Sequence, residues 1–425
     1  MTRFVSSRNT IDKHEHSFQE PSPARTVGVK ERGWRGKLFR AATKAVVSLI
    51  LLLLLGELGS RVLTLLVTPF RSAPFRRYDP QFGVLLIHNS RVIHRRECFE
   101  GEVFTNQWGM RDRERSIDNT DDHLRVALLG DSIIEGVHVK PNEVVNIRME
   151  KLLQDKGYPN AEVLNFGIAG IGTTQELLLY QQKVRRFHPD VVVLAFTTSN
   201  DVMNNSSIIQ PKAYGIHTWY APYYDLSSTG ELIFRPVEQR TLNAVRSVLE
   251  EHSVLAYYAE RIWARINLPL WKWEGIPVYF GVFGDPLDPE WANAWAVTER
   301  ILALLKDAVA TDGPKFIVLV HPEFYRIDPH WRERMTKQVG RIPPSFKPET
   351  SETRLRELAA RNDIKLSFLS PYFESYRDHQ GLTWPYFSLP CDPHYSALGH
   401  EVMAKTIVQE LERNNVLPPA SNPVE

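Results

Sequence analysis

Cysteine is scarce in this sequence of 425 residues, which contains only Cys98 and Cys391. Two cysteines cannot form the dense disulfide framework that holds small secreted domains together, so the fold must depend on a hydrophobic core. One bridge between them is possible if the protein is exported. Two unpaired thiols are an equally good interpretation of the sequence.

The sequence also lacks an excess of charge of either sign. Lysine and arginine total 51 against 50 aspartates and glutamates, which gives a net charge of +1. This balance argues against nucleic acid as the main partner. The sequence contains no histidine pair with metal-ligand spacing on a helix, no glycine-rich phosphate loop and no dinucleotide fingerprint. We therefore expect neither a cofactor nor a metal, and the sequence does not identify a protein partner.

One long apolar run is present near the N-terminus. Residues 45–67 are dominated by leucine and valine. A helix over this run would be ~34 Å long, enough for a hydrocarbon core of ~30 Å. Glu57 and Arg61 lie within it, each costing ~2.5–3.5 kcal/mol at the bilayer centre. Because they are four residues apart, they share a helix face and can pair. We predict a transmembrane anchor, with a buried soluble helix as the alternative. A signal peptide is disfavoured, because the preceding tail is long and no small-x-small cleavage site follows cleanly.

The flanking cations predict the orientation of this anchor. More of them precede the run than follow it: Lys30, Arg32, Arg35, Lys37, Arg40 and Lys44 against Arg71, Arg76 and Arg77. The bias places the N-terminus in the cytoplasm and the chain after Thr68 outside, in the periplasm or extracellular space. The expected organisation is a disordered cytoplasmic tail at 1–40, the anchor at 41–68, a connector at 69–120, a folded domain at 121–415 and a tail at 416–425.

Short apolar runs alternate with helical patterns after Leu124. The expected strands are residues 124–129, 162–166, 191–196, 316–320 and 365–369, and the expected helices are residues 146–156, 174–187, 291–310, 352–361 and 397–412. Near-continuous apolar runs are typical of parallel strands buried on both faces. The alternation predicts an α/β fold, a doubly wound parallel sheet with helices on both faces and a site at the carboxyl ends of its strands.

An insert at about 202–289 interrupts this alternation. It is rich in aromatic residues: Trp219, Tyr220, Tyr223, Tyr224, Trp263, Trp271, Trp273, Tyr279 and Phe280. Because it begins directly after a strand end, we expect it to cover the active-site face as a lid. The aromatic residues either form a platform for a sugar or acyl group or fill a small core of the insert itself.

Polar segments follow the first three expected strands. Gly130-Asp131-Ser132 places a serine at a strand-to-helix turn, where its hydroxyl is exposed and its amide lies near a helix N-terminus. The glycines of the second segment, which ends at Gly170, let a backbone amide approach a substrate oxygen. Asn200, after the third strand, can donate to the same oxygen. Each segment alone is also an ordinary helix-capping loop.

A fourth segment, Asp392-Pro393-His394, follows the last expected strand. A histidine can take the proton of a serine nucleophile, and a carboxylate can hold its tautomer. The two-residue spacing lets Asp392 and His394 lie on the same side of an extended loop. His321 ends a strand and is either a lining residue or structural, and His400 is expected to help begin the last helix.

The four segments together resemble the SGNH/GDSL hydrolase family, named for Ser, Gly, Asn and His in four blocks. These are Ser132, Gly170, Asn200 and His394 here, and the resemblance covers roughly Leu124 to Leu411 apart from the insert. It implies a three-layer α/β/α, flavodoxin-like fold and acyl-ester chemistry. Ser132 would be the nucleophile and His394 the general base, and the amides of Ser132 and Gly170 would form an oxyanion hole with the Asn200 side chain.

The sequence departs from the family pattern at two points. Thr198 occupies the position where the family usually has a glycine, and Asp392 precedes the histidine by two residues instead of three. The shorter spacing resembles a membrane-anchored bacterial subgroup and polysaccharide O-acetyltransferases. Asp392 is the expected orienting acid, and Gly167 is an alternative to Gly170.

Three functions follow from these blocks. The first is an extracytoplasmic esterase acting on acyl, chiefly acetyl, esters of a glycan or lipid-like substrate. The second is a polysaccharide O-acetyltransferase that uses the same residues. The third is a non-catalytic envelope glycan-binding protein, which the complete set of blocks disfavours because such a protein needs no aligned serine and histidine.

Overall fold

The computed structural model describes residues 29–66, 75–95, 98–119, 123–214, 221–238, 245, 248–249, 252–266, 272–382 and 385–420. Helix α1 (Val29–Leu66) contains a stretch, Gly36–Leu66, with a mean hydropathy of 2.1. This stretch is long and apolar enough to cross a membrane. Residues 29–40, assigned to a disordered tail from the sequence, are helical instead. They contain no proline, and lysine and arginine are good helix formers, so the helix begins before the apolar run.

The two charges within the apolar run have hydrogen-bond partners. Arg61 Nε lies 2.7 Å from Glu57 Oε1, so the expected pair is present. Glu57 also accepts hydrogen bonds from the backbone N–H groups of Val254 and Leu255, at 3.1 and 3.0 Å. These two residues begin helix α8 (Val254–Ile266). Glu57 therefore caps the N-terminus of a helix that is distant in the sequence, an interaction that helix spacing alone does not predict.

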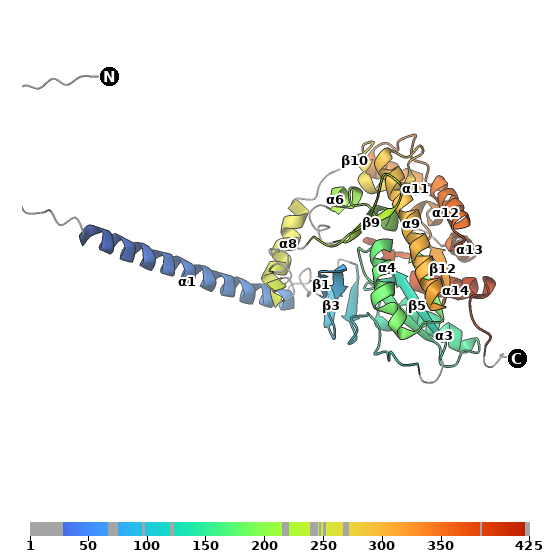
Figure 1. The fold of residues 1–425 in the computed structure, drawn as a ribbon, viewed down its shortest axis with the longest axis horizontal. Coiled ribbons are helices and arrows are strands. Elements are labelled where there is room, and N and C mark those ends of the chain that lie inside the picture. Colours follow the sequence, from blue (N-terminus) through green and yellow to red (C-terminus); the bar gives the residue numbers. More distant parts are fainter. Residues whose placement is uncertain are drawn as a thin grey trace, which may run out of the picture. The chain divides into compact units, whose positions relative to one another are not determined.

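A parallel sheet of five strands forms the centre of the domain (Figure 1). Its strands are β5 (Arg125–Gly130), β6 (Glu162–Gly167), β7 (Val191–Phe196), β12 (Lys315–Val320) and β13 (Leu366–Phe368). Their order is β13-β12-β7-β5-β6, and all neighbouring pairs are parallel. This is the doubly wound, flavodoxin-like order, in which the chain changes direction across the sheet between β5 and β7.

Strand β7 shows how the sheet divides the hydrophobic core into two. Val192, Leu194 and Phe196 belong to one buried cluster, whereas Val191 and Val193 belong to the other. The first cluster includes residues of α4 (Thr173–Gln182), α9 (Pro289–Asp312) and α12 (Glu349–Arg361). The second includes residues of α3 (Val145–Asp155), α13 (Ser370–Gln380) and α14 (Ala397–Arg413). The predicted three-layer α/β/α architecture is confirmed.

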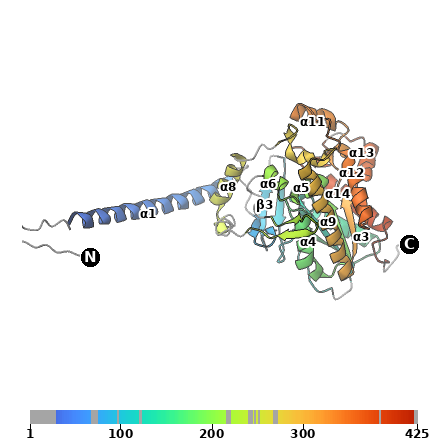
Figure 2. The ribbon, with the colours of Figure 1, turned by 45° about the horizontal axis from the view of Figure 1, so that its top comes forward.

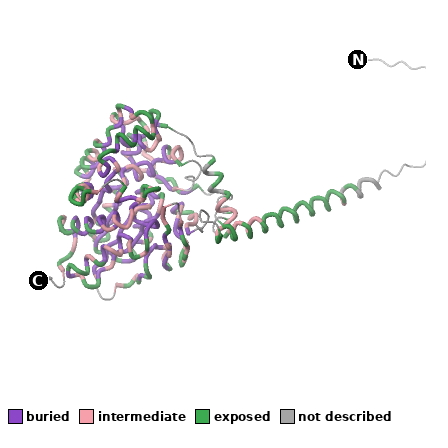
Figure 3. The backbone as a smooth tube through the Cα atoms, turned by 180° about the vertical axis from the view of Figure 1, so that it is seen from behind, coloured by how far each residue is buried: buried purple, intermediate pink, exposed green. Residues whose placement is uncertain are grey.

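The views of the domain agree with this layering. Helices α4 and α9 lie side by side over one face of the sheet (Figures 1 and 2). The buried residues concentrate in the interior of the domain, whereas α1 is exposed over most of its length (Figure 3). An apolar residue at every position of β7 is therefore explained by burial from both sides.

The connector forms two antiparallel hairpins, which its turn-rich composition does not predict. They comprise β1 (Arg76–Asp79) with β2 (Gly83–Leu86), and β3 (Arg91–Arg95) with β4 (Glu100–Phe104). Phe75, Leu86, Val103 and Val137 form a small core beneath them. These strands of four or five residues mix charged and apolar side chains, and an alternation that short is a weak strand signal.

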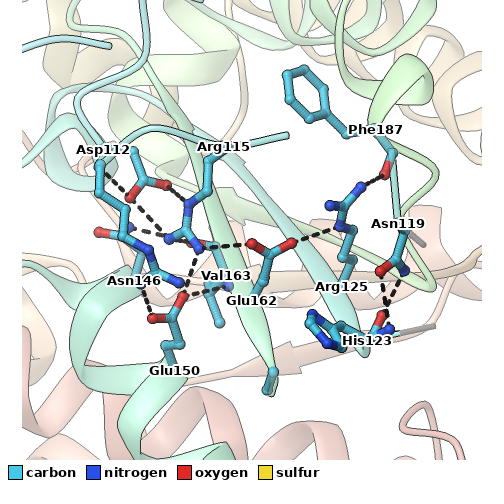
Figure 4. A network of polar contacts seen from close by, with 12 residues as sticks. Asp112, Arg115, Asn119, His123, Arg125, Asn146, Glu150, Glu162, Val163 and Phe187 are labelled. Carbon is cyan, nitrogen blue, oxygen red and sulfur yellow. Dashed lines mark hydrogen bonds and ion pairs between the residues drawn. The ribbon is translucent and has the colours of Figure 1, made fainter. Parts of the chain in front are cut away.

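A buried ionic network fixes the end of the connector to the sheet (Figure 4). The fully buried Arg115 side chain bonds Asp112 at 2.9 Å and Glu150 of α3 at 2.9 Å. It also donates to the carbonyl of Val163 in β6 at 3.1 Å. Because each charge has an opposite partner and further hydrogen bonds, the network can be buried at a tolerable cost. The connector is thus part of the folded domain.

The insert contains small elements of its own. They are α6 (Ile209–Tyr214), the hairpin of β8 (Tyr223–Leu226) and β9 (Leu232–Arg235), helix α8, and the short hairpin of β10 (Lys272–Trp273) and β11 (Ile276–Pro277). Tyr223, Trp273 and Phe280 are buried, which favours the core interpretation for these aromatics. Trp219, Tyr220 and Trp271 lie outside the described residues.

Candidate active site

Ser132 begins a short helix directly after the central strand β5. Helix α2 (Ser132–Glu135) starts after Asp131, whose side chain accepts a hydrogen bond from the N–H of Ile133 at 2.8 Å. The helix ends at Gly136, where a φ of 64° turns the chain away. This φ lies in the left-handed region that glycine adopts without strain. The turn leaves Ser132 partly exposed at the carboxyl end of the sheet, as the sequence predicts.

His394 links Ser132 to Asp392. Its Nε2 atom lies 2.7 Å from Ser132 Oγ, and its Nδ1 atom is hydrogen-bonded to Asp392 Oδ1. The backbone N–H of His394 donates to the same carboxylate at 3.0 Å. Burial alone would raise the pKa of Asp392, but these hydrogen bonds outweigh it and hold that pKa below its ordinary value. An ionised Asp392 keeps the proton on Nδ1, so that Nε2 can accept the serine proton.

A disulfide bond holds the loop that carries these residues. Cys98 and Cys391 are bonded, with their Cα atoms 5.8 Å apart. Cys391 directly precedes Asp392, which begins β15 (Asp392–Tyr395), and Cys98 lies just before β4. The connector is therefore covalently tied to the residue beside the candidate acid.

The two candidate oxyanion glycines differ in their surroundings. Gly167 is buried, its N–H donates to Asn165 at 2.9 Å, and a Cβ there would lie 2.2 Å from the Glu135 nitrogen. Gly167 is thus required for close packing of β6 against α2. Gly170 is exposed, has a φ of 80°, and has no heavy atom within 4 Å of an added Cβ. Gly170 therefore borders open space.

Asn200 lies in helix α5 (Thr198–Asn204), directly after β7. Its Nδ2 atom donates to Asp131 Oδ2 at 2.6 Å, and its Oδ1 atom accepts from Asn204 Nδ2 at 2.8 Å. The hydroxyl of Tyr214, in the insert, lies 3.4 Å from the same oxygen. One N–H of the Asn200 amide is therefore engaged by the residue that precedes Ser132, and the amide carries a second N–H.

Several buried polar groups near Asp131 were not identified from the sequence as a set. Glu176 and His321 have no hydrogen-bond partner for their side chains among the described residues. Burial, together with repulsion from Asp131, raises the pKa of Glu176 well above its ordinary value, and burial lowers the pKa of His321 to about 4. His321 is therefore neutral at neutral pH, and burial favours the protonated form of Glu176. The sequence singles out His321, at a strand end, as a candidate lining residue, but Glu176 lies in an apolar helix and resembles a core position.

Glu323 offers a test of this buried polar region. Its carboxylate accepts hydrogen bonds from Ser199 N and Oγ at 2.8 and 3.1 Å. Burial raises the pKa of Glu323 from 4.5 to about 7, against the opposing effect of those bonds. The folded protein therefore holds this proton more tightly than the unfolded chain. Proton binding by Glu323 therefore adds to the free energy of unfolding. This contribution is complete below pH ~4.5 and is lost as the pH rises through ~7.

We expect Glu323→Gln to remove this pH dependence, because glutamine stays neutral and can still accept from Ser199. Between pH 5 and pH 8, the unfolding free energy of the natural protein should fall relative to that of the variant by ~1–3 kcal/mol. Thermal unfolding across this range measures the difference. Glu349→Gln, at an exposed glutamate, is the matched control. Parallel curves for Glu323→Gln and the natural protein would contradict the assignment.

Comparison with known proteins identifies one matching family. Residues 128–339 match the model of the GDSL-like Lipase/Acylhydrolase family. No curated protein matches the chain. Asp392 and His394 lie beyond the matched residues.

Solved structures with a similar arrangement include esterases and lipases. One is the lipase/acylhydrolase from Enterococcus faecalis, which is 14% identical over 70% of this chain and 98% of its own, with a TM-score of 0.34. Another is a catalytic mutant of an acetylxylan esterase from Geobacillus stearothermophilus, 14% identical over 68% of this chain and 94% of its own, with a TM-score of 0.34.

Proposed function

The chain belongs, through residues 128–339, to the GDSL-like lipase/acylhydrolase family and is a serine hydrolase of the SGNH type. On this premise we propose that it hydrolyses acyl esters outside the cytoplasm, with Ser132 as nucleophile. The observation that carries the proposal is the placement of His394, hydrogen-bonded to Ser132 on one side and to Asp392 on the other. A buried structural histidine needs neither partner, whereas general-base catalysis needs both.

In the proposed reaction, Ser132 Oγ attacks the ester carbonyl carbon while its proton passes to His394 Nε2, 2.7 Å away. The tetrahedral intermediate collapses when His394 returns this proton to the leaving alkoxide, which departs as the alcohol and leaves the acyl group on Ser132. Water then attacks the acyl-enzyme and gives a proton to His394. Transfer of that proton back to Ser132 Oγ releases the carboxylic acid and restores the enzyme.

The oxyanion of each intermediate would be stabilised by donors at the ends of three adjacent strands. These are the amides of Ser132 and Gly170 and the Asn200 side chain. The open space beside Gly170 supports its assignment over Gly167, whose amide is already engaged. Asp131 orients the Asn200 amide through one N–H, which leaves the other for the substrate. Donors fixed in advance need no reorganisation during the reaction.

The location of the catalytic domain is part of the proposal. Helix α1 would anchor it in a membrane, with the N-terminus in the cytoplasm as the flanking cations indicate. The Cys98–Cys391 bond supports export, since disulfides persist in oxidising compartments and are rare in the cytosol. A domain tethered in this way would meet O-acylated glycans or lipid-like esters at the outer face of the membrane, and we propose an acetylated substrate of this kind.

The experiment that tests this function measures p-nitrophenyl acetate turnover by the purified full-length chain in detergent, with and without xylo- or manno-oligosaccharides. We expect p-nitrophenol and free acetate in equal amounts, at a rate independent of the sugars. Acetylated sugar formed in place of acetate would establish a transferase instead. An enzyme that neither turns over the ester nor reacts with a fluorophosphonate probe would contradict serine chemistry and favour a binding protein.

A further inference from the structure

The candidate base His394 is stacked on a second histidine. The rings of His138 and His394 have centroids 3.9 Å apart and planes inclined by only 15°. His138 follows α2 in the segment Gly136-Val137-His138 and is 8% exposed. Its position between two valines gives no indication in the sequence that it reaches the active-site loop. One face of the His394 ring is thus covered by a buried aromatic ring.

The connector supports His138 from behind. The ring of Phe99 contacts His138 edge to face, with centroids 4.8 Å apart at 63°. His94 of β3 lies 5.5 Å from Phe99 and 6.4 Å from His138. Phe99 adjoins Cys98, which is bonded to Cys391 beside Asp392. The β3–β4 hairpin therefore holds the His394 loop twice, by a covalent bond on one side and by a stack of rings on the other.

His138 is suited to lie against a ring that becomes charged. The titratable groups that face it are His394 and Asp392 on β15, His94 on β3 and His400 on α14. Burial is the main cause that lowers the pKa of His138, and the nearby His394 adds to it, so His138 is neutral at neutral pH. A neutral ring adds no positive charge beside the imidazolium that forms when His394 takes the serine proton.

We propose that His138 is a positioning residue, which fixes the plane of the His394 ring and shields one of its faces from water. This inference rests on the proposed function, because it concerns the base of that reaction. Without the stack, the ring of His394 could tilt about its bond to the chain while it keeps its hydrogen bond to Asp392. Nε2 would then lose its alignment with Ser132 Oγ, and misplacement by about 1 Å costs ~100-fold in rate.

A metal site is the competing interpretation. His138, Asp392 and His394 each offer a ligand atom, and these atoms lie within 4.8 Å of one another. The lone pairs of an imidazole lie in the plane of its ring. Two nearly parallel, stacked rings therefore direct their lone pairs along separate planes and do not converge on one ion. Moreover, both nitrogens of His394 already have partners, Ser132 and Asp392.

Two variants separate stacking from other roles. His138→Phe keeps an aromatic ring without nitrogens, whereas His138→Ala removes the ring. We expect His138→Ala to lower kcat for p-nitrophenyl acetate ~10–100-fold with little change in KM, and His138→Phe to stay within ~3-fold of the natural enzyme. His379→Ala, at an exposed histidine of α13, is the matched control. Thermal unfolding of each variant identifies a loss that arises from misfolding.

The pH dependence provides a readout that a merely structural role would not change. Removal of the ring exposes His394 to water, which favours its charged form. The acid limb of kcat/KM should therefore move to higher pH in His138→Ala. It should stay in place in His138→Phe, which keeps an aromatic ring. The NMR titration of the His394 ring, assigned by its loss in His394→Gln, should shift in the same way and requires no turnover.

The outcomes distinguish this inference from the proposed function. Absence of turnover in the natural enzyme would reject the function, while the NMR titration would still decide whether His138 shields His394. An unshifted titration in His138→Ala would overturn the inference. A His138→Phe variant as impaired as His138→Ala would also overturn it, because the ring nitrogens would then matter more than the stack. Activity lost on chelation and restored by Zn²⁺ would establish the metal interpretation instead.

Discussion

Replacement of Ser132 by alanine is expected to lower the turnover of p-nitrophenyl acetate ~10⁴-fold or more. The alanine removes Oγ, the atom that lies 2.7 Å from His394 Nε2 and would form the acyl-enzyme. Single losses from a serine–histidine pair are this costly because the two residues act as a unit. Folding should be unaffected, since Ser132 is partly exposed and its neighbour Asp131 still caps α2. Steady-state kinetics and thermal unfolding of the purified protein measure both effects.

Ser375→Ala is a matched control, because this exposed serine lies in α13 and contacts His379. His394→Gln should reproduce the loss seen in Ser132→Ala, and the double variant should be no worse than either single one. Retained turnover in Ser132→Ala, with correct folding, would reject the serine mechanism. A fluorophosphonate probe that labels the natural chain but not the variant would place the reactive group at Ser132 independently of any substrate.

The central sheet could be predicted from the sequence because burial leaves a strong local signal. Strand β7 has the predicted bounds, 191–196, since six consecutive apolar residues are explained only by helices on both faces. The approach of Ser132 to His394 could be predicted as well, for a different reason. Ser132 directly follows β5 at the carboxyl edge of the sheet. Asp392 and His394 lie in β15, which helix α13 separates from β13, so strand order alone does not bring them to Ser132. Their approach was expected from the resemblance of the four segments to the SGNH pattern.

The disulfide bond, the cap on α8 and the stacked histidine could not be predicted, because each depends on a contact between residues that are distant in the sequence. Cys98 and Cys391 are separated by 293 residues, and nothing near either one indicates the other. Glu57 was treated as a cost to membrane insertion, but its acceptor role toward Val254 and Leu255 requires knowledge of where α8 begins. His138 is a third example: its sequence neighbours are valines, and its proposed role depends on its contact with the ring of His394 in β15. A local sequence pattern indicates whether a residue is buried, but it does not indicate which distant residue it contacts.

The second large effect is expected from the disulfide bond. Cys98→Ala combined with Cys391→Ala should lower the unfolding free energy by ~3–5 kcal/mol, because the bond closes a long loop and restricts the unfolded chain. Turnover should fall as well, since Cys391 adjoins Asp392 and the released loop would no longer hold the acid and His394 against Ser132. Chemical denaturation and p-nitrophenyl acetate kinetics measure the two consequences, and the double variant leaves no thiol to mispair.

Treatment of the natural protein with a reductant should reproduce both effects, whereas the double variant should not respond to it. If the loop were held mainly by the Phe99–His138–His394 stack, stability would fall while turnover stayed near its natural level. The same bond reports on location. Protein taken from cells, denatured and treated with a thiol-alkylating reagent should remain unlabelled unless it is first reduced. Labelling without reduction would show that the bond does not form in the cell, and the proposed export would then lose its support from the disulfide.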